Sequence, residues 1–136
     1  MVIDSSALIA LLLAEPEAEQ FVAAIAGAQS RLISAASYLE TAIVMLARSG
    51  PDAQDKVDRL LAELSVTIVP FARDQAILGI TAYRQYGKGS GHSADLNFGH
   101  CFTYALAKLT GKPVFKGNDF ALTDIGLAVV PQRGSS

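Results

Sequence analysis

The sequence has little cysteine, little charge and no long apolar run, and each scarcity excludes a class of protein. Cys101 is the single cysteine among 136 residues, so no internal disulfide can form, which fits a reducing cytosol. Eleven Lys and Arg stand against thirteen Asp and Glu, so the chain as a whole is not a basic nucleic-acid binder. No stretch approaches the roughly 18–20 uninterrupted apolar residues of a transmembrane span. The apolar residues 7–14 follow an acidic residue rather than a basic segment, which argues against a secretory signal.

Apolar side chains, in contrast, are abundant. Hydrophobic residues make up 51% of the chain and charged residues 18%, which excludes intrinsic disorder and provides for a sizeable core. The length suits one globular domain, and no internal repeat or low-complexity tract interrupts it. We therefore expect a single cytoplasmic domain over residues 1–136 with no membrane association.

Short apolar runs alternate with longer segments of helical periodicity. The runs predict strands over residues 1–4, 31–34, 66–69, 113–116 and 127–130. The periodic segments predict helices over residues 7–13, 15–26, 37–48, 52–65, 73–86 and 97–109, with a glycine-rich loop from Gly87. Because strands that alternate with helices are joined by crossovers, we expect a three-layer α/β/α domain around a short, mainly parallel sheet. Sites in such domains lie at the carboxyl ends of the strands.

Four acidic residues lie at or near the ends of these elements. Asp4 ends the first strand, where it fits an N-cap and a site residue equally well. Glu40 lies on a helix face that is otherwise apolar. It is either a solvated residue at the edge of that face or a metal ligand. Asp119 and Asp124 follow the fourth strand, where each also suits a turn or a cap. Clustered carboxylates repel, so together they favour a site for Mg²⁺ or Mn²⁺, ions that activate water against phosphodiesters.

Four segments, in order and at matching spacing, carry a resemblance to a known family. They are MVIDSSALIALL at the start, SAASYLET around Glu40, GHSADLNFGHCFTYALA in the last third and FKGNDFALTDI near the end. Over nearly the whole chain they resemble the VapC-type PIN-domain ribonuclease toxins. The resemblance implies a PIN-like fold, a Mg²⁺- or Mn²⁺-dependent endoribonuclease, a homodimer, and a VapB-type antitoxin that silences it. It also implies that Asp4, Glu40 and Asp119 are the first, second and fourth acids of the site, with Asp124 as a supporting metal ligand.

The third acid of the family is missing here, because His100 stands where relatives usually have aspartate in Leu-Asn-aromatic-Gly-Asp-Cys. Asp95 lies five residues earlier and so does not reach the same place on the helix. We include His100 among the catalytic and metal-binding candidates. It is a ligand of a softer metal, a natural weakening of the site, or an introduced attenuating change. The alternative function is therefore a catalytically impaired PIN-domain protein that binds antitoxin or RNA as a regulatory module.

Charge is distributed unevenly, in a way that would suit an RNA substrate. Between residues 84 and 118 a single acidic residue, Asp95, stands against Arg84, Lys88, Lys108, Lys112 and Lys116. A basic third beside an acidic metal site suits phosphate contacts, although such residues also form ordinary solvated surface.

Two apolar stripes are candidates for partner contacts. They are Leu39, Ile43 and Leu46 on one expected helix, and Val57, Leu60, Leu61 and Leu64 on the next. Such stripes make a groove for an antitoxin helix or a dimer seam, or they form the core of the domain.

Overall fold

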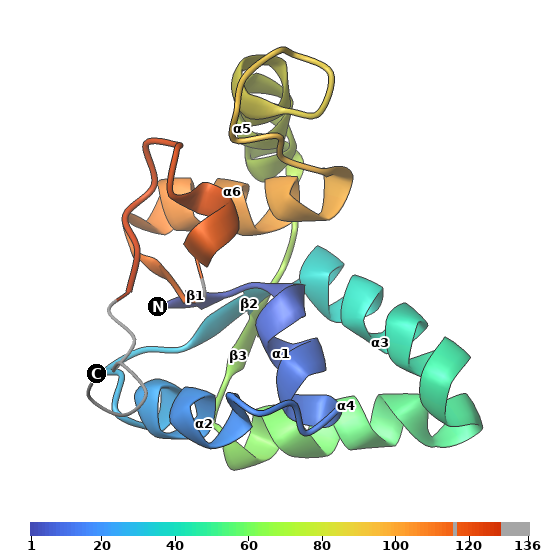
Figure 1. The fold of residues 1–136 in the computed structure, drawn as a ribbon. Helices are drawn as coiled ribbons and strands as arrows, with labels where there is room; N and C mark the ends of the chain where they lie inside the picture. The colour runs from blue at the N-terminus through green and yellow to red at the C-terminus, as the bar shows by residue number, and fades with distance from the viewer. Residues whose placement is uncertain (116, 129–136) are drawn as a thin grey trace.

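A four-stranded parallel sheet lies between two layers of helices in the computed structural model, which describes residues 1–115 and 117–128 (Figure 1). The strands run in the order β3-β2-β1-β4, and every pairing is parallel. Their bounds are Val2–Ile3 for β1, Leu32–Ser34 for β2, Thr67–Val69 for β3 and Val114–Phe115 for β4. Leu127 adds an isolated parallel bridge to Val114. Residues 116, 129 and 130 of the expected strands lie outside the described residues.

Helices cover both faces of the sheet (Figure 1). One face carries α1 (Ser5–Leu12), α2 (Ala18–Ala26), α3 (Ala35–Ser49) and α4 (Ala53–Glu63). The other carries α5 (Arg73–Tyr86) and α6 (Phe98–Thr110), and the 3₁₀ segments are η1 (Gly50–Asp52) and η2 (Gly117–Phe120). The predicted three-layer α/β/α arrangement with a parallel sheet is confirmed. Within the described part of the chain, no helix is long and apolar enough to cross a membrane.

The capping residues account for the helix boundaries that the sequence predicted wrongly. Helix α1 begins at Ser5 rather than residue 7, because the carboxylate of Asp4 accepts the backbone N–H of Ser6 and so caps the helix. Helix α3 begins at Ala35 rather than residue 37, because the hydroxyl of Ser34 accepts the backbone N–H of Ala36.

Alternation along the strands divides the core into two clusters, one on each face of the sheet. Ile3, Ile33 and Phe115 point toward α1–α4, where they pack with Phe21, Met45 and Leu61 among others. Val2 and Val114 point to the other face, where they pack with Leu106 and further residues of α5 and α6. Successive side chains of a strand point to opposite faces, so even these two-residue strands connect both cores.

The two apolar stripes have different environments. Val57, Leu61 and Leu64 are buried in the core beneath the sheet, as the core interpretation predicted. Helix α3 instead buries Ser37, Thr41 and Met45, and leaves Leu39, Ile43 and Leu46 at least half exposed. The α3 stripe is therefore surface, and it remains available to a partner.

Candidate metal centre

The topology brings the ends of three parallel strands to one edge of the sheet. The chain leaves β1 for β2 and β3 on one side and returns to β4 on the other, so the strand order reverses at β1. Ligands of open parallel sheets bind outside the carboxyl ends of the strands at such a reversal. Asp4 directly follows β1, Glu40 lies in the helix that follows β2, and Asp119 lies in η2 after β4.

Asp4 is a buried carboxylate, with 2% of its surface exposed. Its Oδ2 accepts the backbone N–H of Ser6 at 3.2 Å and the hydroxyl of Ser6 at 2.7 Å. Its Oδ1 accepts the hydroxyl of Thr103, from α6, at 2.6 Å. Among the residues that the structure describes, no cationic side chain forms an ion pair with it. Burying a carboxylate among neutral donors is costly, so this position suits a bound cation.

Glu40 is linked to Asp4 through Ser5. Ser5, which follows Asp4 in the chain, donates its hydroxyl to Glu40 Oε1 at 2.7 Å. Asp4, the N-cap of α1, therefore provides one carboxylate, and Ser5, the first residue of α1, orients the carboxylate of Glu40. Two carboxylates held in this way form an oxygen-donor set, which hard divalent ions such as Mg²⁺ and Mn²⁺ prefer.

His100 uses both ring nitrogens within the protein. Its Nδ1 accepts the backbone N–H of Asn97 at 3.1 Å, while the Asn97 side chain accepts the His100 backbone N–H at 2.9 Å. This reciprocal capping box begins α6. A backbone N–H can only donate, so the ring proton of neutral His100 lies on Nε2, which faces Asp119 Oδ2 at 3.2 Å. In this orientation His100 holds Asp119 and has no free lone pair for a metal.

Asp124 lies in a separate cluster. It accepts the hydroxyl of Tyr104 at 2.7 Å and the ammonium of Lys108 at 2.6 Å, both from α6. The bond to Lys108 lowers the pKa of Asp124 below its ordinary value, while burial and the bond to Asp124 raise the pKa of Tyr104. These contacts fasten the segment after η2 to α6. They also occupy Lys108, one of the basic residues that the sequence suggested for RNA.

The structure thus joins the candidate acids in pairs rather than in one cluster. Asp4 and Glu40 are linked through Ser5, Asp119 is joined to His100, and Asp124 is apart. Across residues 1–115 and 117–128, no three His, Cys, Asp or Glu side chains lie close enough to hold a metal together. The sequence reasoning missed Ser5 and Thr103, which orient the two carboxylates. Their signal was weak, since an Asp-Ser-Ser sequence reads as a simple helix cap and a helical Thr reads as surface.

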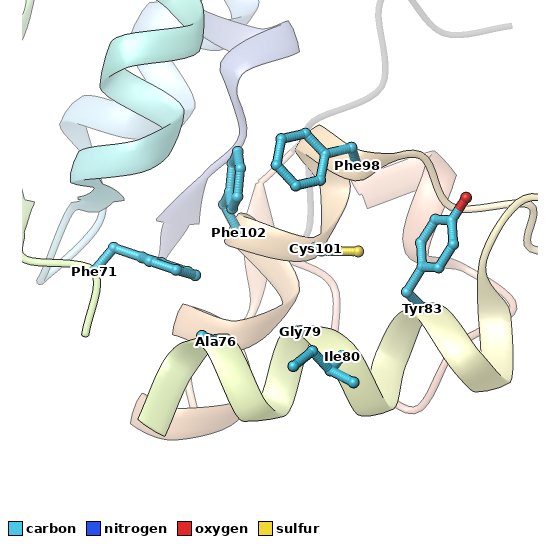
Figure 2. Close-up of a pocket in the computed structure, with 8 residues that line it drawn as sticks. All are labelled: Phe71, Ala76, Gly79, Ile80, Tyr83, Phe98, Cys101 and Phe102. Atoms are coloured by element: carbon cyan, nitrogen blue, oxygen red, sulfur yellow. The ribbon is translucent and has the colours of Figure 1, made fainter. Parts of the chain in front are cut away.

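Two apolar grooves flank the centre and share the aromatic rings of Phe98 and Phe102. The first, of about 480 Å³ between α5 and α6, is lined by Phe71, Ala76, Gly79, Ile80, Tyr83, Phe98, Cys101 and Phe102 (Figure 2). The second, of about 360 Å³, is lined by Ala36, Leu39, Glu40, Ile43, Val44, Phe98 and Phe102. Phe98 is 74% exposed although it is fully apolar. An apolar surface therefore extends from α5 across α6 to Glu40 and α3.

Comparison with known proteins agrees with this architecture. The PIN domain family matches residues 1–126. Ribonuclease VapC30 of Mycobacterium tuberculosis is 50% identical over 132 residues, covering 96% of this chain and 100% of that protein. Ribonuclease VapC of Mycolicibacterium smegmatis is 51% identical over 126 residues, covering 92% and 97%.

Solved structures share the fold at lower sequence identity. VapC20 of Mycobacterium tuberculosis, described as a toxin that cleaves the sarcin–ricin loop, superposes with a TM-score of 0.73 at 16% identity, covering 96% of this chain and 98% of that one. A chain of a toxin–antitoxin complex from Klebsiella pneumoniae gives 0.65 at 21% identity, covering 94% and 95%. The chain has a parallel sheet with acids at its carboxyl edge, and the PIN domain family matches its residues 1–126. The chain is therefore a member of the PIN-domain family. Within that family it belongs with the VapC-type ribonucleases.

If Asp124 anchors the fold, replacing it should change acid stability and leave metal binding unchanged. A carboxyl whose pKa is lowered by folding stabilises the protein above its unfolded pKa of about 3.9, and that stabilisation is lost as the pH falls through the folded pKa. We expect Asp124→Asn to lower the free energy of unfolding near neutral pH by up to about 1 kcal/mol, because the pair is half exposed.

The difference between wild type and Asp124→Asn should shrink below pH 4, as measured by urea unfolding at a series of pH values. Mn²⁺ affinity, measured by calorimetry at pH 7, should be equal in the two proteins. A large loss of Mn²⁺ affinity in Asp124→Asn would make Asp124 a ligand rather than an anchor.

Proposed function

We propose that this protein is the toxin of a VapBC-type toxin–antitoxin pair and cuts RNA phosphodiester bonds with Mg²⁺ or Mn²⁺ held by Asp4 and Glu40. One observation carries the metal site: a buried Asp4 carboxylate, surrounded in the described structure by neutral donors, lies one residue from the hydroxyl that orients Glu40. VapC nucleases of the PIN family are generally dependent on a divalent metal, which supports the assignment. We take residues 1–136 as one PIN domain that acts in the cytoplasm, where its RNA substrate and its antitoxin are.

Each residue of the centre has a distinct role in this proposal. Asp4 and Glu40 would hold the divalent ion, whose chemistry there would be to activate a water for attack on phosphorus. Asp4 provides the fixed negative charge, and Ser6 and Thr103 hold its two oxygens in place. Ser5 orients Glu40 toward the same edge. Asp119 is the more exposed acid, with 52% of its side chain exposed, and its contact with His100 sets where it points.

His100 weakens the centre in this account. A carboxylate at position 100 would add two charged oxygens, whereas the neutral ring adds none and engages Asp119 instead. Mg²⁺ strongly prefers oxygen ligands, so the loss falls most heavily on that ion. The orientation supports a weakened oxygen site over a ligand of a softer metal, because Nδ1 accepts the Asn97 backbone N–H and Nε2 faces Asp119 Oδ2 at 3.2 Å.

Restoring an acid at this position should therefore raise the activity. We expect His100→Asp to cleave total RNA roughly tenfold or more faster than wild type with Mg²⁺, and to bind Mn²⁺ more tightly by a similar factor. The measurement is parallel cleavage with Mg²⁺ and with Mn²⁺, together with calorimetric Mn²⁺ titration.

Two further variants make this comparison specific. His92→Asp is the matched control, since His92 packs on Tyr86 in the loop before α6, and it should leave cleavage unchanged. Adding Glu40→Gln should abolish the gain. Equal cleavage by wild type and His100→Asp would show that the third acid is dispensable here. Absence of cleavage by both would favour the alternative, a binding module that has lost catalysis.

We also propose that the chain forms a homodimer through the apolar surface on α3 and α5. The support is its extent: Leu39 and Ile43 on α3 and Ile80 on α5 are each more than half exposed. Leu39 and Ile43 line one apolar groove, Ile80 lines the other, and the two grooves share Phe98 and Phe102. Continuous apolar surface of this kind marks interaction sites on soluble proteins. A self-complementary face shared by two copies is the commonest way in which a chain closes such a surface.

A charge placed on this face should prevent association without unfolding the chain. Leu39→Asp should convert a dimer to a monomer in sedimentation velocity, with an unchanged far-ultraviolet circular dichroism spectrum. Leu122→Asp is the matched control, because Leu122 is exposed to the same degree, 58% against 59%, but lines neither groove. A wild-type monomer, or a Leu39→Asp dimer, would contradict the assigned surface. A Leu39→Asp variant that dimerises but fails to bind a VapB-type antitoxin would assign the face to the antitoxin.

A further inference from the structure

Gly99 has no room for a side chain, and what fills that room is the carboxylate of Glu40. Gly99 lies in the first turn of α6, directly before His100. A Cβ at position 99 would clash with Glu40 Oε2, and would lie 2.7 Å from Oε1 and 2.8 Å from Cδ. All three contacts are far inside van der Waals distance. The carboxylate of Glu40 therefore rests directly on the backbone of α6, and its Oε1 also accepts the hydroxyl of Ser5.

The backbone of α6 does not itself need a glycine at this position. Gly99 is an ordinary helical residue, unlike Gly50, Gly89, Gly91 and Gly111, whose φ angles are positive. Alanine is the better helix former, so a purely structural role would not select glycine in the first turn. The atoms that block a side chain belong to the flexible end of Glu40, which can swing away without moving the backbone. Only the position of that carboxylate depends on the missing side chain.

We propose that Gly99 is a positioning residue for Glu40, and that its missing side chain lets the Glu40 carboxylate reach the cation site beside Asp4. The inference rests on the proposed metal centre. Ser5 holds Oε1 by a hydrogen bond, and the bare backbone at position 99 leaves the space that the carboxylate occupies. The partial positive charge at the start of a thirteen-residue helix favours a carboxylate at this place.

If Gly99 positions Glu40, replacing it should lower metal affinity without lowering stability. Replacing a glycine that only the fold requires would lower stability. In Gly99→Ala the methyl group displaces the carboxylate, so the affinity for Mn²⁺ should fall by about tenfold or more, the usual effect of misplacing a ligand. The melting temperature in EDTA should stay the same or rise, because alanine favours the helix. Cleavage should fall through weaker metal binding, so that higher Mn²⁺ concentrations restore part of it.

Shortening Glu40 provides the decisive coupling test. Glu40→Asp withdraws the carboxylate by one carbon–carbon bond, about 1.5 Å, which is enough to vacate the space that a methyl group at position 99 needs. Glu40→Asp will weaken Mn²⁺ binding by itself. In that background, however, Gly99→Ala should change the Mn²⁺ affinity less than twofold, because the two substitutions act on one contact and are not additive.

The experiment is calorimetric Mn²⁺ titration, with melting temperatures in EDTA, of wild type, Gly99→Ala, Glu40→Asp and the double variant. Gly27→Ala is the matched control, since a Cβ at the end of α2 would meet only the carbonyl oxygens of Ala23 and Ala24, at an ordinary 3.5 and 3.8 Å. It should leave Mn²⁺ binding unchanged. The inference is overturned if Gly99→Ala binds Mn²⁺ like wild type, if it loses the same factor in both backgrounds, or if it lowers the melting temperature in EDTA. A wild-type protein that binds no Mn²⁺ would instead refute the metal centre itself, and this inference with it.

Discussion

The buried carboxylate of Asp4 is the interaction on which the rest of this structure depends. It ends a strand of only two residues, caps α1 through Ser6, and accepts a hydroxyl from Thr103, which lies 99 positions later in the chain. One side chain therefore connects the sheet to both helical layers. Neutral donors satisfy its hydrogen bonds but do not neutralise its charge, and a buried charge without a counter-ion costs several kcal/mol. The fold thus keeps an unfavourable charge at the place where a cation would be useful.

The neighbouring residues arrange further groups around that charge by short, specific contacts. Ser5 donates a hydrogen bond to the Glu40 carboxylate, which also rests on the bare backbone at Gly99. His100 caps α6 with one ring nitrogen and holds Asp119 with the other. Histidine at position 100 therefore caps the helix and contacts Asp119. An acid at this position would instead add negative charge to the centre. We propose that a VapC-type ribonuclease with histidine at this position keeps the architecture of the site and binds the metal less tightly.

The sequence predicted the layers, the parallel sheet and most of the element order, because apolar periodicity reports which faces are buried. It predicted which acids follow strands, since strand ends are marked by short apolar runs. It could not show that Asp124 is hydrogen-bonded to Lys108 and Tyr104, because an acid after a strand can equally bind a metal or cap a helix. It left open whether Leu39, Ile43 and Leu46 are core or surface, because α3 buries a polar face with Ser37 and Thr41 instead. The role of His100 required coordinates, since an imidazole can ligate, cap or pair with an acid.

The central claim is that the buried carboxylate of Asp4 binds a divalent cation. Thermal unfolding with and without Mn²⁺ tests this claim most directly. Asparagine also caps helices well, so Asp4→Asn keeps the hydrogen-bonding shape of the site while removing its charge. In EDTA the variant should melt at the same temperature as wild type or higher, because the uncompensated charge is gone. Mn²⁺ should raise the melting temperature of wild type and leave that of Asp4→Asn unchanged, since a ligand stabilises only the state that binds it. An equal rise in both proteins, or a variant that is much less stable in EDTA, would contradict the account.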